Sequence, residues 1–248
     1  MKAFVLAAGL GTRLRPFTLE HPKALVPVGG VPMLARVFLR LKDEGFTEIV
    51  VNVHHFADQI ADFLRANGNF GLDVAISDER DRLLDTGGAI LHARSLLGDG
   101  STPFLVHNVD ILSDARLGEL MQRHDESGAM ATLLVSDRDS SRRLCFNETG
   151  ELCGWHNLRD GALKPEGYSP STTDRQLAFS GIHVLSPEQA FAEMERQGRG
   201  GSFSVIDFYT EACRHMAIKG HEAAGLQIID IGKPATLAVA DSLLGGQR

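Results

Sequence analysis

The sequence predicts an α/β protein: a Rossmann-like three-layer α/β/α domain with a mostly parallel mixed sheet and a small additional lobe. Short runs rich in Val and Ile alternate with stretches of helical period along most of the 248 residues, as in successive β-α-β units. The first run, residues 2–7, leads directly into a glycine turn. Open α/β sheets bind ligands at such strand ends, so the opening turn is also the first candidate site.

The first half of the chain carries the regular alternation. Apolar runs predict strands at 2–7, 48–53, 72–77, 103–110 and 129–136, and helical periodicity predicts helices at 32–44, 57–66, 88–97 and 114–126. From about residue 142 the pattern changes to short strands and turns. It predicts a hairpin over 143–157, strands at 178–186 and 226–232, and helices at 187–194, 203–215 and 234–244. We therefore expect a single domain over residues 1–248, with a core at 1–140, a lobe at about 141–200, and a return to the core at 201–248.

Composition and charge limit the classes of partner. The chain has 25 basic and 32 acidic residues, a net charge of −7, which gives no overall attraction to nucleic acid or to an anionic membrane. No window approaches ~18 uninterrupted apolar residues, so no membrane span is expected. Three cysteines without a C-x-x-C pair indicate reduced thiols rather than a disulfide framework. We expect a cytoplasmic protein that is a monomer or a small homo-oligomer.

The opening turn has the composition of an anion-binding loop. Gly9 and Gly11 allow several backbone N–H groups to face one concavity, and Arg13 adds positive charge that can clamp phosphate oxygens. The loop belongs to neither common glycine-rich class. A Walker loop would place Lys and Ser or Thr after Gly11, and a dinucleotide fingerprint would require a small residue at Leu14. A structural turn with solvated arginines is the alternative interpretation of the loop taken alone.

Lys23 favours the anion-binding interpretation. It lies in an extended segment between Pro22 and Pro27, which restrict the backbone and hold the lysine in a defined place. A lysine held in this way provides a point charge suited to a pyrophosphate or a sugar phosphate.

Five stretches, in order along the chain, resemble the signature of the sugar-1-phosphate nucleotidyltransferases: LAAGLGTRLRPFT, PKALVPV, DTGGAI, LVHNVDI and IIDIGKPATLAVAD. The length and the stretch FSGIHVLSP are most similar to compact members of the N-acetylmuramate 1-phosphate uridylyltransferase and mannose-1-phosphate guanylyltransferase types. The resemblance implies that a sugar 1-phosphate oxygen attacks the α-phosphorus of a nucleoside triphosphate, UTP or GTP, and releases pyrophosphate. It also implies Mg²⁺ as the cofactor and a sugar-binding role for the lobe.

The resemblance assigns roles to particular residues. It implies catalytic roles for Arg13, Lys23 and Asp110, and metal ligation by Asp110 and Asp230, which each end an apolar strand and offer the hard oxygen ligands that Mg²⁺ prefers. It places nucleotide binding at Leu6, Ala8, Gly9, Gly11, Thr12, Arg13, Lys23, Gly87 and Gly88, and sugar binding at Asn108, Asn157 and Gly181. At Gly87 and Gly88 a plain helix-start turn is the alternative, and at Asn157 a hairpin-end asparagine.

The chain departs from the family pattern in two places. Val109 precedes Asp110 where relatives commonly have glycine, so we expect a reshaped sugar side of the pocket. Residues 155–157, Trp-His-Asn, stand where some relatives carry a Glu-Lys pair. Two other functions are weighed: a catalytically silent nucleotide-binding regulatory subunit, and a phosphocholine-type cytidylyltransferase. The presence of Arg13, Lys23, Asp110 and Asp230 argues against the regulatory subunit. The scarcity of Tyr and Trp for an aromatic cage argues against the cytidylyltransferase.

Overall fold

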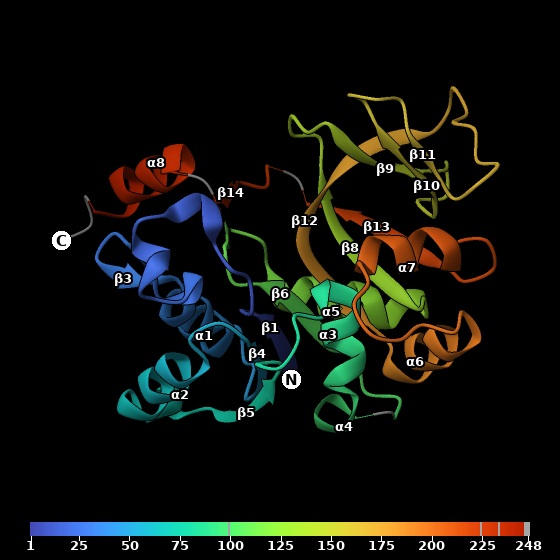
Figure 1. The fold of residues 1–248 in the computed structure, drawn as a ribbon. Coiled ribbons are helices and arrows are strands. Elements are labelled where there is room, and N and C mark those ends of the chain that lie inside the picture. Colours follow the sequence, from blue (N-terminus) through green and yellow to red (C-terminus); the bar gives the residue numbers. More distant parts are fainter. Residues whose placement is uncertain (99, 224, 233, 246–248) are drawn as a thin grey trace.

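The computed structural model, which describes residues 1–98, 100–223, 225–232 and 234–245, is built around a ten-stranded sheet (Figure 1). Its central strands run in the order β8-β12-β6-β1-β4-β5, with β13 pairing β8. The core strands are β1 (Lys2–Leu6), β4 (Glu48–Val53), β5 (Asp73–Asp78), β6 (Phe104–Asn108), β8 (Ala131–Ser136), β12 (Arg175–Leu185) and β13 (Ile218–Glu222). β1, β4, β5 and β6 are mutually parallel, whereas β12 is antiparallel to both of its core neighbours. The sheet is therefore mixed and, in its first half, parallel.

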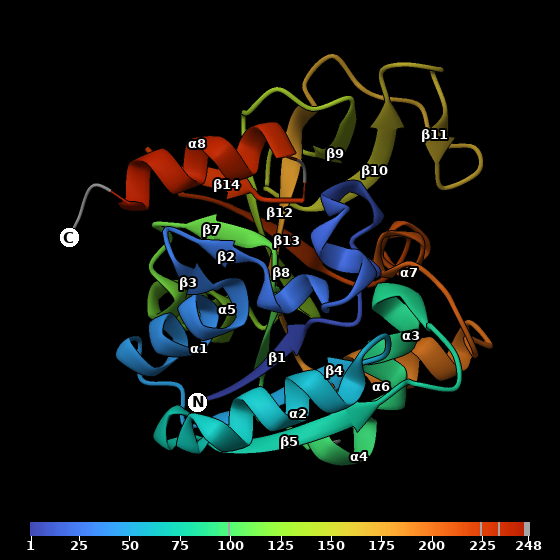
Figure 2. The same cartoon turned by 60° about the vertical axis from the view of Figure 1, so that its left-hand side comes forward.

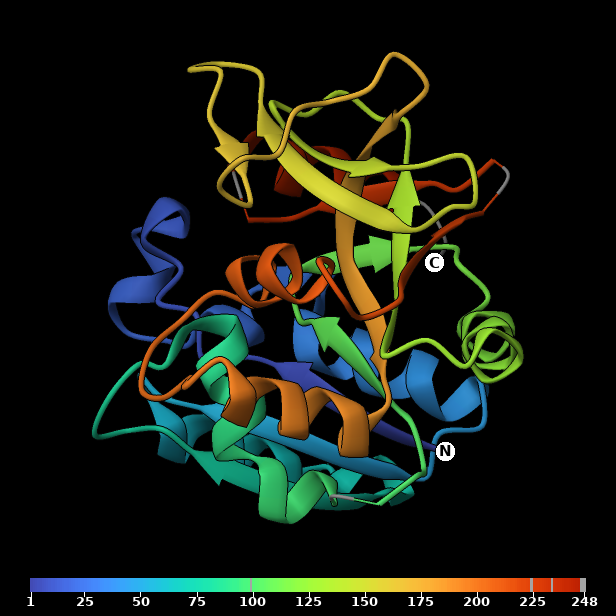
Figure 3. The ribbon, with the colours of Figure 1, turned by 90° about the vertical axis from the view of Figure 1, so that its right-hand side faces the viewer.

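The lobe extends the same sheet. Its strands β9 (Arg142–Phe146), β10 (Leu152–Asn157) and β11 (Leu163–Lys164) continue from the N-terminal part of β12, whose eleven residues span both regions. In Figure 3 these strands, coloured yellow to yellow-green, stand at one end of the molecule above the core. Two further pairs lie outside this sheet: β2 (Pro27–Val28) with β3 (Val31–Pro32), and β7 (Ile111–Ser113) with β14 (Ile228–Asp230).

Helices cover both faces of the sheet because side chains of the strands alternate between them. In β1, Ala3 and Val5 join one buried cluster and Phe4 joins the other. The first cluster is closed by α1 (Met33–Asp43), α2 (Ala57–Ala66), α5 (Leu117–Ser127) and α8 (Pro234–Gly245). The second is closed by α3 (Asp85–His92), α4 (Arg94–Leu97), α6 (Pro187–Arg196) and α7 (Val205–Ala212). The three-layer α/β/α prediction is confirmed, and Figure 2 shows α8 beside β14 and β2, which it contacts.

Several element boundaries differ from the sequence prediction for identifiable reasons. The helix expected at 88–97 begins three residues earlier, at Asp85, so that Gly87 and Gly88 both lie inside it, and it is interrupted at Ala93. The expected helix at 203–215 is shorter, since Ser204 caps α7 by accepting a hydrogen bond from the Ile206 N–H. The sequence also missed β13, whose glycine at 220 packs against the Phe146 ring.

Two further expectations from the sequence concern membrane-spanning helices and the cysteines. No helix in the described ranges is long and apolar enough to cross a membrane. The three cysteines are all free thiols; Cys145 is buried, and Cys153 and Cys213 are half-buried.

The strand register determines what meets at the carboxyl edge of the sheet. Leu6, the last residue of β1, stands between Asn52 of β4 and Asn108 of β6, and Asn52 stands beside Ser77 of β5. Residues in one register row of a parallel sheet point to the same face, so an apolar strand end is flanked by two amides. The candidate site lies immediately beyond this row.

Candidate active site

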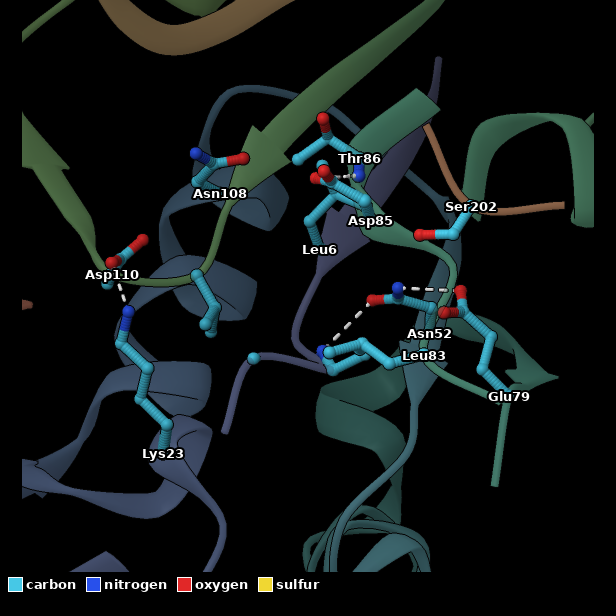
Figure 4. A pocket seen from close by; sticks show the side chains of 13 residues that line it. Leu6, Lys23, Asn52, Glu79, Leu83, Asp85, Thr86, Asn108, Asp110 and Ser202 are labelled. Carbon is cyan, nitrogen blue, oxygen red and sulfur yellow. Dashed lines mark hydrogen bonds and ion pairs between the residues drawn. The ribbon is translucent and has the colours of Figure 1, made fainter. Parts of the chain in front are cut away.

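A cavity of about 420 Å³ opens at the carboxyl ends of β1 and β6 (Figure 4). Segments far apart in sequence line it: the loop after β1, the end of β4, the turn into α3, the end of β6 and the segment before α7. The lining residues are Leu6, Ala8, Gly9, Lys23, Asn52, Glu79, Leu83, Asp85, Thr86, Asn108, Val109, Asp110 and Ser202. Of the predicted nucleotide-binding residues, Leu6, Ala8, Gly9 and Lys23 lie on this surface, whereas Thr12 and Arg13 begin an exposed 3₁₀ turn beside it.

Gly11 is required by the path of the loop and by Lys23. Its φ of +60° lies in the left-handed region, and a Cβ there would stand 2.8 Å from the Lys23 Cβ and 2.9 Å from the Thr18 Cγ2. Thr18 donates a hydrogen bond of 2.8 Å to the Gly11 carbonyl, which fixes the turn. The glycine therefore allows the lysine stem to lie directly against the loop.

The loop keeps its amides available. In the described part of the chain, the backbone N–H groups of residues 9–13 donate no hydrogen bond, although those of Ala7 and Ala8 do. Exposed N–H groups in succession at a glycine turn form a concavity for an anion. The N–H groups of residues 9–13 are therefore free to donate to an anion, and the phosphate-binding role of the loop stays a prediction.

Four charged side chains converge beside this loop. Lys23 Nζ forms an ion pair with Asp110 Oδ2, and the two side chains are only 12% and 16% exposed. A Cβ placed on Gly232 would lie 2.8 Å from Asp230 Oδ1, 3.0 Å from Arg13 Nη2 and 3.2 Å from Asp110 Oδ2. The bare Cα of Gly232 is what allows Arg13, Asp110 and Asp230 to surround one point, and Asp110 links this point to Lys23 in the cavity lining.

The second glycine turn has a packing role that the sequence did not reveal. The N–H groups of Gly87 and Gly88 donate to the Phe203 carbonyl at 2.9 and 3.2 Å. A Cβ on Gly87 would stand 2.4 Å from the Phe203 ring, and one on Gly88 would stand 2.3 Å from the Gly201 carbonyl oxygen. Both glycines are needed for close contact with residues 201–203. Their predicted contact with a base stays a prediction, while Asp85 and Thr86 of the same turn line the cavity.

The predicted sugar-binding residues lie in two places. Asn108 lines the cavity. Gly181, at φ +81°, packs closely against Asn108: a Cβ there would stand 2.7 Å from Asn108 Nδ2. Asn157 is in the lobe, where its Nδ2 donates to Asp160 and its Oδ1 accepts from the Arg159 N–H. The structure thus brings Asn108 and Gly181 together, and Asn157 closes its own hairpin turn instead of lining the cavity.

The two departures from the family pattern also have structural explanations. Val109 is 2% exposed and its side chain belongs to the buried cluster under α1, so the branched side chain leaves little surface for a ligand. The Trp155 ring is covered by Lys164, whose Nζ lies 5.2 Å from the indole ring centroid in a cation–π contact and 2.5 Å from Asp207 Oδ1. The cavity lining includes no aromatic side chain among the described residues.

Sequence reasoning missed Asn52 and Glu79. Asn52 Oδ1 accepts hydrogen bonds from the Ala7 and Ala8 N–H groups, and its Nδ2 donates to Glu79 Oε1 at 2.8 Å. Burial raises the pKa of the Glu79 carboxyl, while the hydrogen bond from Asn52 opposes that rise. The available signal was an asparagine inside the apolar strand EIVVNV, since a buried amide needs partners.

Several known proteins are similar to this chain in sequence or in fold. Over 98% of its length the chain is 33% identical to the N-acetylmuramate alpha-1-phosphate uridylyltransferase of Caulobacter vibrioides, 96% of which is covered. It is 39% identical to a probable mannose-1-phosphate guanylyltransferase of Oryza sativa subsp. japonica, but over 56% of this chain and 39% of that protein. A putative glucose-1-phosphate thymidylyltransferase from Bacillus anthracis has the same fold, with a TM-score of 0.81, 18% identity, and coverage of 100% of this chain and 96% of that one.

The model of the family described as Nucleotidyl transferase matches residues 2–232. This range contains the glycine loop, Lys23, both aspartates and the second glycine turn. Because the match covers most of the chain, the protein belongs to the nucleotidyl transferase family.

Proposed function

We propose that the protein transfers a nucleotidyl group from a nucleoside triphosphate to a sugar 1-phosphate, giving a nucleoside diphosphate sugar and pyrophosphate. The single observation that carries this proposal is the convergence of Arg13, Asp110 and Asp230 around Gly232, with Lys23 paired to Asp110 in the lining of a cavity of about 420 Å³. That volume is within the range of small-ligand sites, ~300–1,000 Å³. A binding module would not need paired carboxylates beside two cations.

The reaction needs positioning and charge neutralisation more than a protein nucleophile. An oxygen of the sugar 1-phosphate forms a bond to the α-phosphorus, and the bond from that phosphorus to the bridging oxygen of the leaving pyrophosphate breaks. The attacking group is already an anion, so the main barrier is to bring two polyanions together. Arg13, Lys23 and the N–H groups of residues 9–13 supply positive charge and donors for this purpose.

Asp110 and Asp230 are the residues that would hold Mg²⁺. Asp110 Oδ2 and Asp230 Oδ1 both lie close to the position that a Cβ on residue 232 would occupy, and the glycine leaves that position empty. Mg²⁺ is commonly bound by one or two carboxylates together with substrate phosphates, so this donor set fits the ion. When bound, the metal would neutralise phosphate charge as a Lewis acid. Lys23 lies beside this donor set, paired with Asp110 in the cavity lining, where its charge can also face substrate phosphates.

We propose UTP and N-acetylmuramate 1-phosphate as the substrates. The support is the uridylyltransferase of Caulobacter vibrioides, 96% of whose length is matched, whereas the guanylyltransferases match 56% to 90% of this chain but only 39% to 66% of their own length. GTP with mannose 1-phosphate is the competing pair. The absence of aromatic side chains from the cavity lining of the described residues argues against a quaternary-amine acceptor such as phosphocholine.

The test is pyrophosphate release on a matrix of nucleoside triphosphates and sugar 1-phosphates with Mg²⁺. We expect release that requires both substrates, with the highest kcat/KM for UTP and N-acetylmuramate 1-phosphate. Preference for GTP with mannose 1-phosphate would contradict the substrate assignment and keep the reaction class. Failure to release pyrophosphate with every pair, in protein that binds nucleotide, would instead support a regulatory subunit.

A further inference from the structure

We propose that Asn52 and Glu79 are positioning residues, which hold the phosphate-binding loop and the second turn of the pocket in one fixed arrangement. We call this pair the amide–carboxylate strut. The inference rests on the proposed function, because it assigns the pair to the nucleotide half of that site.

The first contact of the strut is with the start of the loop. Asn52 Oδ1 accepts hydrogen bonds of 2.6 Å from the Ala7 N–H and 3.2 Å from the Ala8 N–H. These are the first two amides after β1 ends at Leu6, where the sheet no longer supplies their partners. One side chain therefore fixes the direction in which the chain leaves the sheet. The amides that follow, residues 9–13, are left for a ligand.

The second contact ties this amide to the opposite wall. Asn52 Nδ2 donates to Glu79 Oε1 at 2.8 Å, and Glu79 Oε2 lies 3.4 Å from the Leu84 N–H, just before the Asp85 and Thr86 that line the cavity. The Glu79 carbonyl accepts from the Arg82 N–H at 3.0 Å and lies 2.7 Å from His54 Nδ1, which hold the backbone of the glutamate. Figure 4 shows Asn52 lying next to Glu79, with the hydrogen bond drawn between them.

The burial of the pair separates positioning from direct contact with substrate. Asn52 is 2% exposed and Glu79 is 3% exposed, so almost all of each side chain is covered by protein. The three amide and carboxylate oxygens involved already accept four hydrogen bonds. A nucleotide in the cavity would touch the elements that the strut holds, and only the margins of the strut itself. Misplacing those elements by about 1 Å is enough to lower the rate substantially.

An exchange of the two groups tests this role. The Asn52→Asp substitution places the new carboxylate against that of Glu79, so that two acceptors face each other. The Glu79→Gln substitution places an amide N–H opposite the Leu84 N–H, so that two donors face each other. In the double variant the new aspartate still accepts from Ala7 and Ala8, and the new glutamine donates to it and accepts from Leu84. The net charge of the protein is unchanged by the exchange.

We expect each single variant to raise the KM for UTP about ten-fold, the loss of roughly one buried hydrogen bond, with little change in the KM for the sugar 1-phosphate. The double variant is expected to return to within about three-fold of the wild type. Gln122 and Glu126 provide a matched control, because they form the same amide–carboxylate hydrogen bond, also 2.8 Å, on the exposed side of α5. The single and exchanged variants of that pair should leave both KM values unchanged.

Two results would overturn the inference. One is a double variant that loses as much as the product of the single losses. The other is found if both single variants shift the two KM values together, or shift kcat alone, and the shift is proportional to the drop in melting temperature. That result would indicate a purely structural role for the pair. If Asn52→Asp does not fold alone, Glu79→Gln and the double variant still give this comparison. An inactive wild type would contradict the proposed function, whereas an active wild type without rescue contradicts only the strut.

Discussion

Lys23 and Asp110 are 87 residues apart in sequence and form an ion pair whose two side chains are largely removed from solvent. The pair joins the segment between two prolines to the end of β6, the fourth parallel strand. Both groups belong to the predicted catalytic set, and the ion pair fixes the position of each relative to the other.

Replacing Lys23 by alanine is expected to lower kcat about a hundred- to a thousand-fold, because the developing pyrophosphate loses a preorganised cation. The fold should be retained, since among the described residues the amine pairs with Asp110 alone. Steady-state pyrophosphate release measures the loss. Lys42→Ala, at an exposed lysine that donates to the Phe70 carbonyl, is the control and should keep wild-type activity. Comparable activity in the two variants would remove Lys23 from the site.

Gly232→Ala is expected to abolish most activity while keeping the fold. The added methyl would stand 2.8 Å from Asp230 Oδ1 and 3.0 Å from Arg13 Nη2, so the charged groups could no longer surround the same point. Gly100→Ala, where a Cβ meets nothing within 4 Å, is the control. Circular dichroism checks the fold and turnover checks the site. Wild-type turnover in Gly232→Ala would show that this convergence is not needed.

Gly87→Ala should destabilise the protein by about 1–3 kcal/mol, although alanine inside a helix ordinarily stabilises relative to glycine. The reason is the Phe203 ring, which a Cβ would approach to 2.4 Å. In a double-mutant cycle with Phe203→Ala, urea unfolding should reveal a coupling free energy of about 1 kcal/mol or more. Additive losses would instead point to a role for Gly87 outside this contact.

Two buried histidines are expected to make stability depend on pH. Burial lowers the pKa of His107 to about 4 and that of His183 to about 3. The unfolded chain binds these protons near pH 6.5, so acidification favours unfolding: stability is highest above 6.5 and falls toward pH 4. At pH 5 each histidine contributes a loss of about 2 kcal/mol relative to pH 7.5.

His183→Leu tests this dependence. Neither ring nitrogen of His183 has a hydrogen-bond partner among the described residues, so leucine removes the titration without breaking a hydrogen bond, although the ring contacts with Phe179 and Tyr209 are lost. Urea unfolding at pH 7.5 and pH 5 should show a smaller difference in the variant by about 2 kcal/mol. An identical pH dependence in the two proteins would mean that His183 is protonated in the folded state.

Much of the fold could be predicted from local patterns. Strand 48–53 and helix 57–66 have the predicted bounds, because each combines a clear period with end signals. β7, β13 and β14 could not be fully predicted, since they are short and half-buried and are defined by pairing with distant strands. The order of β12 between β6 and β8 likewise depends on long-range contacts that no window of sequence contains.

The candidate site divides in the same way. Arg13, Lys23, Asp110 and Asp230 could be named from motif chemistry; the structure places Arg13 and both aspartates around Gly232 and pairs Lys23 with Asp110. That glycine, and the strut of Asn52 and Glu79, had no motif to reveal them, because their roles are close approach and buried hydrogen bonding. Gly87 and Gly88 show the converse: their predicted ligand contact is untested, and their packing against residues 201–203 was not foreseen.

An oxygen isotope label shows directly which phosphorus atom the sugar phosphate attacks. The protein is incubated with Mg²⁺, UTP and a sugar 1-phosphate labelled with ¹⁸O in its non-bridging phosphate oxygens, and the products are separated and weighed. Attack by the sugar phosphate on the α-phosphorus gives a nucleoside diphosphate sugar that retains all of the label, with one labelled oxygen bridging the two phosphorus atoms, and unlabelled pyrophosphate. Label in the pyrophosphate, or pyrophosphate formed without a diphosphate sugar, would contradict attack by the sugar phosphate on the α-phosphorus.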